Sequence, residues 1–80
     1  MTKGEYRVGI NFNPSGDDLV GRIKRASADL IDLIETIDVA HGGQAINPEV
    51  VRLKATAQTA IEDGAMWAVK AATKPAPAEG

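Results

Sequence analysis

The stretch DDLVGRIKRASADLIDLIETIDVAHGGQAINPE, residues 17–49, decides the fold because it joins an amphipathic helix, a glycine turn and a second helix start. Apolar residues recur in its first part at steps of three and four, the spacing of one helical face. They are Leu19, Ile23, Ala26, Leu30, Ile34 and Ile37, with Val20, Ser27 and Leu33 widening the same stripe. Ser15 and Asp18 fit a capping-box pattern, so the spacing predicts a helix that starts after Ser15 and runs to about Val39.

A turn and a second helix follow. The paired glycines Gly42 and Gly43 supply the left-handed backbone that ends helices and turns chains. Asn47-Pro48-Glu49 then combines a capping residue, proline at the first helical position and an acid in the first turn. The sequence therefore predicts an all-α fold, an antiparallel two-helix hairpin over residues 17–74 whose second helix runs to about Thr73, and a disordered tail at 75–80.

The second helix is apolar over more than one stripe. Small residues fall on one face and larger apolar residues on adjoining positions. The small residues are Ala57, Ala60, Gly64, Ala68 and Ala71, and the larger ones are Val50, Leu53, Ile61, Met66, Trp67 and Val69. A two-helix hairpin has one contact seam, and a chain of 80 residues without cysteine buries little surface on its own. We therefore expect a homo-oligomer in which other copies cover Trp67 and its neighbours.

Residues 1–16 precede the hairpin and have a different pattern. Tyr6, Val8, Ile10 and Phe12 alternate with other residues, which is the period of a strand. No partner strand is evident in the chain. We therefore expect a short extended N-terminal arm that lies on the helices or on a neighbouring copy.

Composition excludes several classes of function. A formal net charge of −2 argues against a duplex DNA binder, and no apolar run is long enough to span a bilayer. The first residues lack the apolar segment of a secretory signal, so we expect a cytoplasmic protein. His41 is the single histidine and there is no cysteine, so neither a metal site, nor a cofactor, nor a catalytic constellation is indicated. The sequence favours binding over catalysis.

Positive charge is local and lies near aromatic residues. Two groups stand out. The first consists of Arg22, Lys24 and Arg25 on the first helix with Lys3 and Arg7 before it, near Tyr6 and Phe12, and the second of Arg52 and Lys54 in the second helix. Cations that contact phosphate beside a ring that stacks on a base can hold a nucleotide. The hairpin geometry separates Lys24 from Arg52, so the groups serve different sites or meet across subunits. The alternative is that these cations are solvated and that Arg52 pairs with Glu35 or Asp38.

Four segments carry a resemblance to a known family. Residues 52–57 (RLKATA) and 65–75 (AMWAVKAATKP), with residues 4–7 (GEYR) and 23–25 (IKR), resemble the hairpin domain of the phage sponges. These are the anti-CBASS and anti-Thoeris proteins, which sequester cyclic nucleotide immune signals without cleaving them. The resemblance implies a compact homohexamer of helical hairpins, with ligand pockets between subunits, acting in the cytoplasm of the infected bacterial host.

The resemblance also implies roles for individual residues. It makes Tyr6 the ring that stacks on the bases of a cyclic dinucleotide and Lys24 the contact to its phosphates. Arg52 is the best match to an arginine that holds cyclic trinucleotides at a separate site. The segment between the tyrosine and the first long helix is longer than in the shortest members, which leaves Phe12 as a second candidate for stacking. A sponge for cyclic ADP-ribose-type signals and a hairpin that docks on another protein remain as alternatives.

Overall fold

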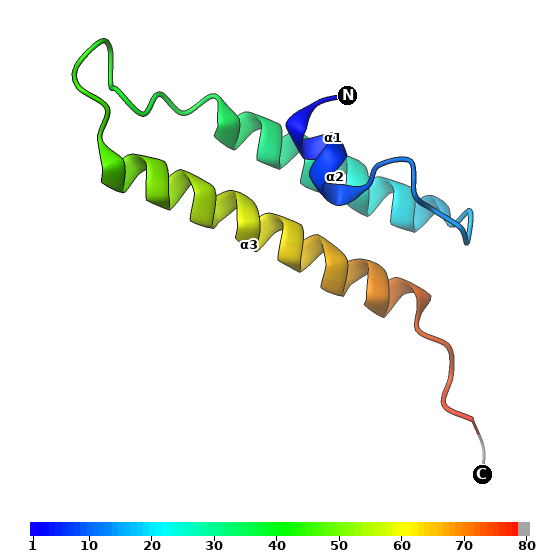
Figure 1. Cartoon of the computed structure of the whole chain (residues 1–80). Helices are drawn as coiled ribbons and strands as arrows, with labels where there is room; N and C mark the ends of the chain where they lie inside the picture. Colours follow the sequence, from blue (N-terminus) through cyan, green and yellow to red (C-terminus); the bar gives the residue numbers. More distant parts are fainter. Residues whose placement is uncertain (79–80) are drawn as a thin grey trace.

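The chain forms three helices, and the structure, a computed structural model, describes residues 1–78. They are α1 (Lys3–Val8), α2 (Asp18–Glu35) and α3 (Pro48–Thr73). Figure 1 shows that α2 and α3 run antiparallel as a hairpin and that α1 lies across α2. No strand occurs in residues 1–78, so the all-α hairpin prediction is confirmed. None of these helices combines the length and apolarity needed to cross a membrane.

The prediction of an extended N-terminal arm is wrong, because residues 3–8 form α1. Thr2 and Glu5 make a complete capping box, in which each side chain accepts a hydrogen bond from the backbone N–H of the other residue. Gly9 ends the helix in the left-handed conformation at φ 64°. The alternating apolar residues were misleading because a lone strand has no hydrogen-bonding partner here, whereas a capped helix satisfies its own backbone.

Both ends of α2 differ from the prediction. Asp17 is the N-cap in place of Ser15, since its carboxylate accepts the Leu19 N–H at 2.9 Å. The helix ends at Glu35, four residues before Val39. The Asp38 carboxylate accepts the N–H groups of Ala40 and Gly42, and these bonds fold the chain into the inter-helix loop instead of another helical turn.

The second long helix matches its prediction. Asn47 is the N-cap of α3, Pro48 is the first helical residue and Thr73 is the last. Gly42 and Gly43 have φ values of 78° and 96°, so the turn has the left-handed backbone expected of it. Residues 74–78 have no regular secondary structure, and residues 79 and 80 of the expected tail lie outside the described residues.

The buried face of α2 is not the stripe that the sequence indicated. The hydrophobic core consists of Val20, Ala28, Ile31 and Ala65. Leu30, in the middle of the expected stripe, remains 41% exposed. The difference arises because α1 packs on α2 and shifts the covered face toward Ala28, while the more apolar face stays open.

Close backbone contact and a polar network fix α1 on the hairpin. A Cβ at Gly4 would lie 2.1 Å from the Ala28 carbonyl oxygen, so only glycine fits there, and the Gly4 N–H donates to the Asp32 carboxylate at 2.7 Å. Lys3 donates to Glu35 at 2.7 Å and to Gln58 at 2.9 Å. These bonds connect α1 to both long helices.

A shallow apolar groove runs between α2 and α3 and has no lining residue from α1. Its walls contain small residues and a few larger apolar ones: Ile23, Ala26, Ser27, Leu30, Ala60, Ile61, Gly64, Ala65 and Ala68. We call this surface the open groove. The predicted stripe of α2 and the small-residue face of α3 thus lie side by side, and no other segment within residues 1–78 lines the groove.

Candidate functional site

A cavity of about 220 Å³ lies where α1 meets the C-terminal half of α3. Its lining combines two cations and one acid with apolar side chains: Arg7, Val8, Lys24, Glu62, Ala65, Met66 and Val69. Formal charges of +2 and −1 leave the lining with a net charge of +1. This cavity brings together two of the predicted site residues, Arg7 and Lys24.

The Arg7 guanidinium extends from α1 toward α3. Its Nε donates to Glu62 Oε1 at 2.5 Å, and a terminal nitrogen donates to the Thr59 hydroxyl at 3.2 Å. The Arg7 side chain is 21% exposed, so it is held in place by two partners and still reaches solvent at the cavity. A guanidinium that is positioned in this way loses little further freedom when it binds an anion.

Lys24 occupies the centre of this region and is only 8% exposed. Its ammonium donates to the carbonyl oxygens of Gly9, at 3.0 Å, and Phe12, and it lies 5.4 Å from the centre of the Phe12 ring. Lys24 also lines a second cavity, on the Phe12 side. The side chain therefore sits between the cavity that contains Arg7 and the loop that joins α1 to α2.

The two aromatic candidates lie on the surface. Tyr6 is 77% exposed and Phe12 is also exposed. Tyr6 follows the buried Gly4 by two residues, which turns its side chain about 200° around the helix axis and away from the hairpin. Neither ring is packed in the core, so both are free to stack on a planar group.

Arg25 serves as an ion-pair partner on the surface. It contacts Glu5 at 2.8 Å and Asp29 at 2.7 Å. The hydrogen bond from Arg25, followed by the backbone bond from Thr2, lowers the pKa of Glu5 to about 2. Arg25 therefore ties α1 to α2, and it does not line the cavity that contains Arg7 and Lys24.

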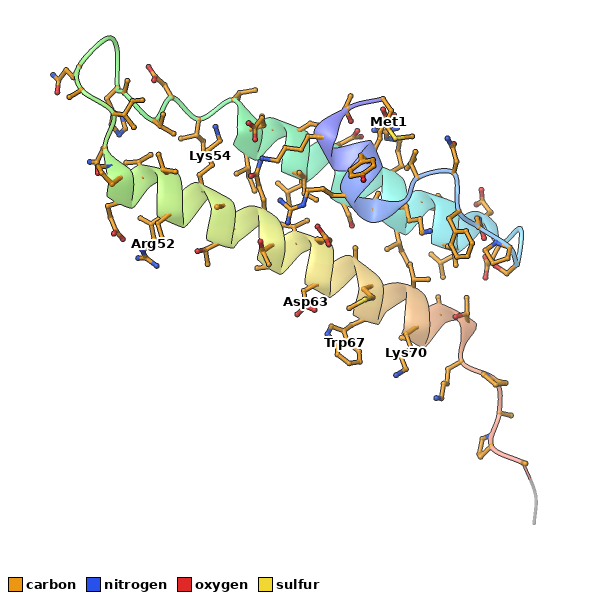
Figure 2. All side chains as sticks on the ribbon, viewed as in Figure 1. Met1, Arg52, Lys54, Asp63, Trp67 and Lys70 are labelled. Carbon is orange, nitrogen blue, oxygen red and sulfur yellow. The ribbon has the colours of Figure 1, made fainter. Side chains whose placement is uncertain are left out.

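Arg52 and Lys54 project from different sides of α3 (Figure 2). Arg52 pairs with Glu49, one turn away on the same helix, so the expected pairing with Glu35 or Asp38 is wrong. Lys54 donates to the Ile37 carbonyl at 3.1 Å and lies 3.8 Å from Glu35. Arg52 lines a separate hollow on the outer face of α3. This hollow shares Glu62 and Met66 with the cavity that contains Arg7, but Lys24 is not among its lining residues, so one chain does not bring the two groups of cations into one cavity.

Sequence reasoning missed Glu62 and Gln58. Glu62 holds Arg7, and Gln58, which is 1% exposed, donates to the Ile31 carbonyl at 3.1 Å and to Glu35 at 2.8 Å. The capping box at Thr2 and Glu5 was the signal that could have revealed α1. A helix at residues 3–8 places Lys3 and Arg7 on one face, four residues apart, and these two side chains contact Gln58 and Glu62.

The arrangement is suited to holding an anion. It offers two fixed cations at an apolar cavity and two exposed rings nearby in the sequence. Within residues 1–78, no three potential ligands gather in a way that could hold a metal ion. Cations of this kind suit a phosphate group, and apolar or aromatic surface suits a base.

Searches of curated proteins and of solved structures found no significant match to this sequence. The hairpin domain described as "Acb2/Tad1, hairpin domain" matches residues 4–73, which include all three helices except the first residue of α1. This span covers nearly the whole chain. The chain therefore belongs to the Acb2/Tad1 hairpin-domain family, the anti-CBASS and anti-Thoeris sponges, whose members bind their targets.

Proposed function

We propose that this protein binds cyclic oligonucleotide immune signals and holds them intact, and that it thereby blocks CBASS-type immunity in an infected bacterium. Family membership over residues 4–73 is the observation that carries the proposal. Cyclic dinucleotides are the first choice of ligand and cyclic trinucleotides the second. Membership is equally compatible with cyclic ADP-ribose-type signals, which are the targets of the anti-Thoeris branch.

The cations of the site support a ligand with phosphate groups. Arg7 and Lys24 line one cavity, and both are held in fixed positions by neighbouring groups. Charge-assisted hydrogen bonds from such groups to phosphate are about twice as strong as neutral ones. In this proposal Lys24 and Arg7 contact phosphate, and Arg25 is a secondary cation at the same end of α2.

The exposed rings support a ligand with bases. Tyr6 projects away from its own hairpin, so a base stacked on it lies outside the fold of that chain. We propose that a second copy completes the pocket, with Phe12 as a further stacking surface. Arg52 and Lys54 belong, in the same proposal, to a separate site for trinucleotides.

The shape of the chain supports assembly. Its accessible surface is 5673 Å², whereas a compact monomer of 8.4 kDa exposes about 4,600 Å². The radius of gyration is 16.1 Å, against about 12 Å for a compact chain of this length. The open groove and Trp67, which is 58% exposed, are the apolar surfaces that we expect further copies to cover, and we propose six copies in all.

Calorimetric titration against a panel of cyclic dinucleotides, cyclic trinucleotides and cyclic ADP-ribose isomers tests the proposal. We expect tight binding of at least one dinucleotide and recovery of the intact ligand after heat denaturation of the complex. Tyr6→Ala removes a stacking surface worth about 1–3 kcal/mol per base and should weaken binding by about fivefold to a hundredfold. Light scattering should show that the oligomer persists.

Lys24→Gln should weaken binding by about tenfold or more, because it removes a charged hydrogen-bond donor. Arg22→Gln is the matched control, since Arg22 is an exposed cation of α2 that lines neither cavity next to Lys24. If no member of the panel binds, the sponge proposal is wrong. If Lys24→Gln leaves function intact while a change at Trp67 or Gly64 abolishes it, the chain is a protein-docking module instead.

A further inference from the structure

Lys24 is a buried cation that has no acidic partner among residues 1–78. Neighbouring cations do have carboxylate partners: Lys3 pairs with Glu35, and Arg7 pairs with Glu62. The Lys24 ammonium instead contacts two backbone carbonyl oxygens and the face of one ring. A buried charge is costly unless it is paired, and carbonyl dipoles compensate it only in part.

The carbonyl groups that hold Lys24 come from a short turn, residues 9–12. The Phe12 N–H donates to the Gly9 carbonyl at 2.9 Å and closes the turn, and Gly9 has the left-handed backbone that ends α1. The Phe12 ring is exposed, so the turn is not anchored by burial of that side chain. Its polar contact with α2 is the Lys24 ammonium.

Lys24 also borders the cavity that contains Arg7. An anion that enters this cavity therefore meets a wall formed in part by Lys24, whose ammonium is held by the carbonyl oxygens of Gly9 and Phe12. A phosphate oxygen carries a full charge, and its bond to an ammonium is stronger than the bond from a neutral carbonyl. A phosphate group that bonds to the Lys24 ammonium would have to share its three N–H donors with the carbonyl oxygens of the turn.

We infer that residues 9–12 act as an internal substitute for the ligand: their carbonyl oxygens occupy Lys24 in the free chain, and a phosphate group displaces them and releases the turn. This inference rests on the proposed function, since it requires a phosphate-bearing ligand at Lys24. It adds a regulatory step to that site, because part of the binding energy is used to open the turn. The observed affinity is then lower than the affinity of a chain whose turn is already open.

Amide hydrogen exchange in the full-length wild-type protein tests the inference, with cyclic di-AMP and cyclic GMP–AMP as the two probes. The Phe12 N–H donates to the Gly9 carbonyl, so we expect it to be protected in the free protein. On binding of either probe, we expect exchange at Phe12 to rise at least fivefold while exchange in α3 slows or stays constant. Unchanged or slower exchange at Phe12 with bound nucleotide overturns the inference and leaves the proposed function standing. Failure of both probes to bind overturns the inference together with their assignment as ligands.

A pair of glycine variants gives an independent measurement. Gly9 and Gly16 both have φ 64°, so alanine strains the backbone equally at the two positions, but only Gly9 belongs to the turn that holds Lys24. An added Cβ at Gly9 meets only ordinary contacts, the nearest at 3.7 Å, and one at Gly16 meets nothing within 4 Å. We expect Gly9→Ala to bind the probes about threefold to tenfold more tightly than wild type, because the competing turn is weakened.

Gly16→Ala should bind with the wild-type affinity. Tighter binding by Gly9→Ala alone supports competition between the turn and the ligand. Weaker or unchanged binding by Gly9→Ala indicates that the carbonyl oxygens help the site or are irrelevant to it, and either result overturns the inference.

Discussion

The two sides of the α2–α3 pair differ in how far other segments of the chain cover them. On one side α1 lies in backbone contact with α2, and its polar groups are matched by Asp32, Glu35 and Gln58. On the other side the open groove exposes apolar and small side chains, and no further segment of the described residues lines it. The covered side is specified by hydrogen bonds that fit only one partner, whereas the open side offers a smooth apolar surface that suits another helix.

The covered side is therefore packed within a single chain, whereas the open side is available to another helix. The covered side carries Tyr6 and Arg7 and thus positions the candidate ligand contacts. The open side carries none of the candidate cations and is suited to association. Substitutions on the two sides should therefore have different consequences, one for the docking of α1 and the other for assembly.

The largest effect is expected for Gly4→Ala on the covered side. The new Cβ would lie 2.1 Å from a backbone oxygen that cannot move aside, so α1 must leave α2. We expect a loss of about 3 kcal/mol in the free energy of unfolding, measured with denaturant. Gly21→Ala is the control because its Cβ meets nothing closer than 3.9 Å. Equal stability of the two variants would show that α1 does not pack closely.

The next effect is expected for Leu30→Glu on the open side. If further copies cover this surface, as we propose, a charge there should raise the dissociation constant of the assembly by about thirtyfold, equivalent to about 2 kcal/mol. Ile46→Glu introduces the same charge at an exposed position in the inter-helix loop and should change nothing. Sedimentation at several protein concentrations measures both. An unchanged assembly in Leu30→Glu would mean that the groove has another purpose.

A smaller effect is expected for Gln58→Met on the covered side. Methionine fills a similar volume but leaves Lys3, Glu35 and the Ile31 carbonyl without one partner each. Buried polar groups that lose a partner cost about 1–2 kcal/mol in the free energy of unfolding. Gln44→Met, in the exposed loop, is the control. Thermal unfolding should separate the two variants, and coincident curves would refute a structural role for Gln58.

The smallest effect is expected from acid. Hydrogen bonds from Gln58 and Lys3 lower the pKa of Glu35 from 4.5 to about 2, and the pKa of Glu5 is lowered equally far. A lowered pKa means that the carboxylates stabilise docking fully above pH 4.5 and lose this contribution as the pH falls toward 2. The NMR amide signal of Val8 in α1 should follow this window, with Thr56 in α3 as reference. A constant Val8 signal down to pH 2 would contradict it.

The sequence was sufficient for the existence of both long helices, for the ends of α3 and for the turn, because capping residues, glycines and periodicity are local signals, but it misplaced both ends of α2. Asn47 and Pro48 began α3 as predicted, and Gly42 and Gly43 turned the chain. The face that α2 buries was not predictable, since it depends on where α1 docks. The role of Gln58 depends on the same tertiary contact, because a lone polar residue in a helix gives no sign of burial.

The candidate site was predictable only as a set of residue types. Arg7 and Lys24 were singled out for their charge, and the structure places both at one cavity. The partners of Lys24 are backbone carbonyl oxygens, which every residue has and which no pattern can mark. The assignments to ligand contacts at Tyr6, Phe12, Arg25, Arg52 and Lys54 stay predictions.

The outward direction of Tyr6 has a thermodynamic consequence. A molecule that stacks on this ring and also touches a second copy is bound by the assembly and by neither chain alone. Its concentration and the association of copies are then linked, so that adding the molecule raises the melting temperature and adding protein raises the affinity. A dilute chain would be a poor receptor, and its capacity to trap a signal would rise faster than its abundance.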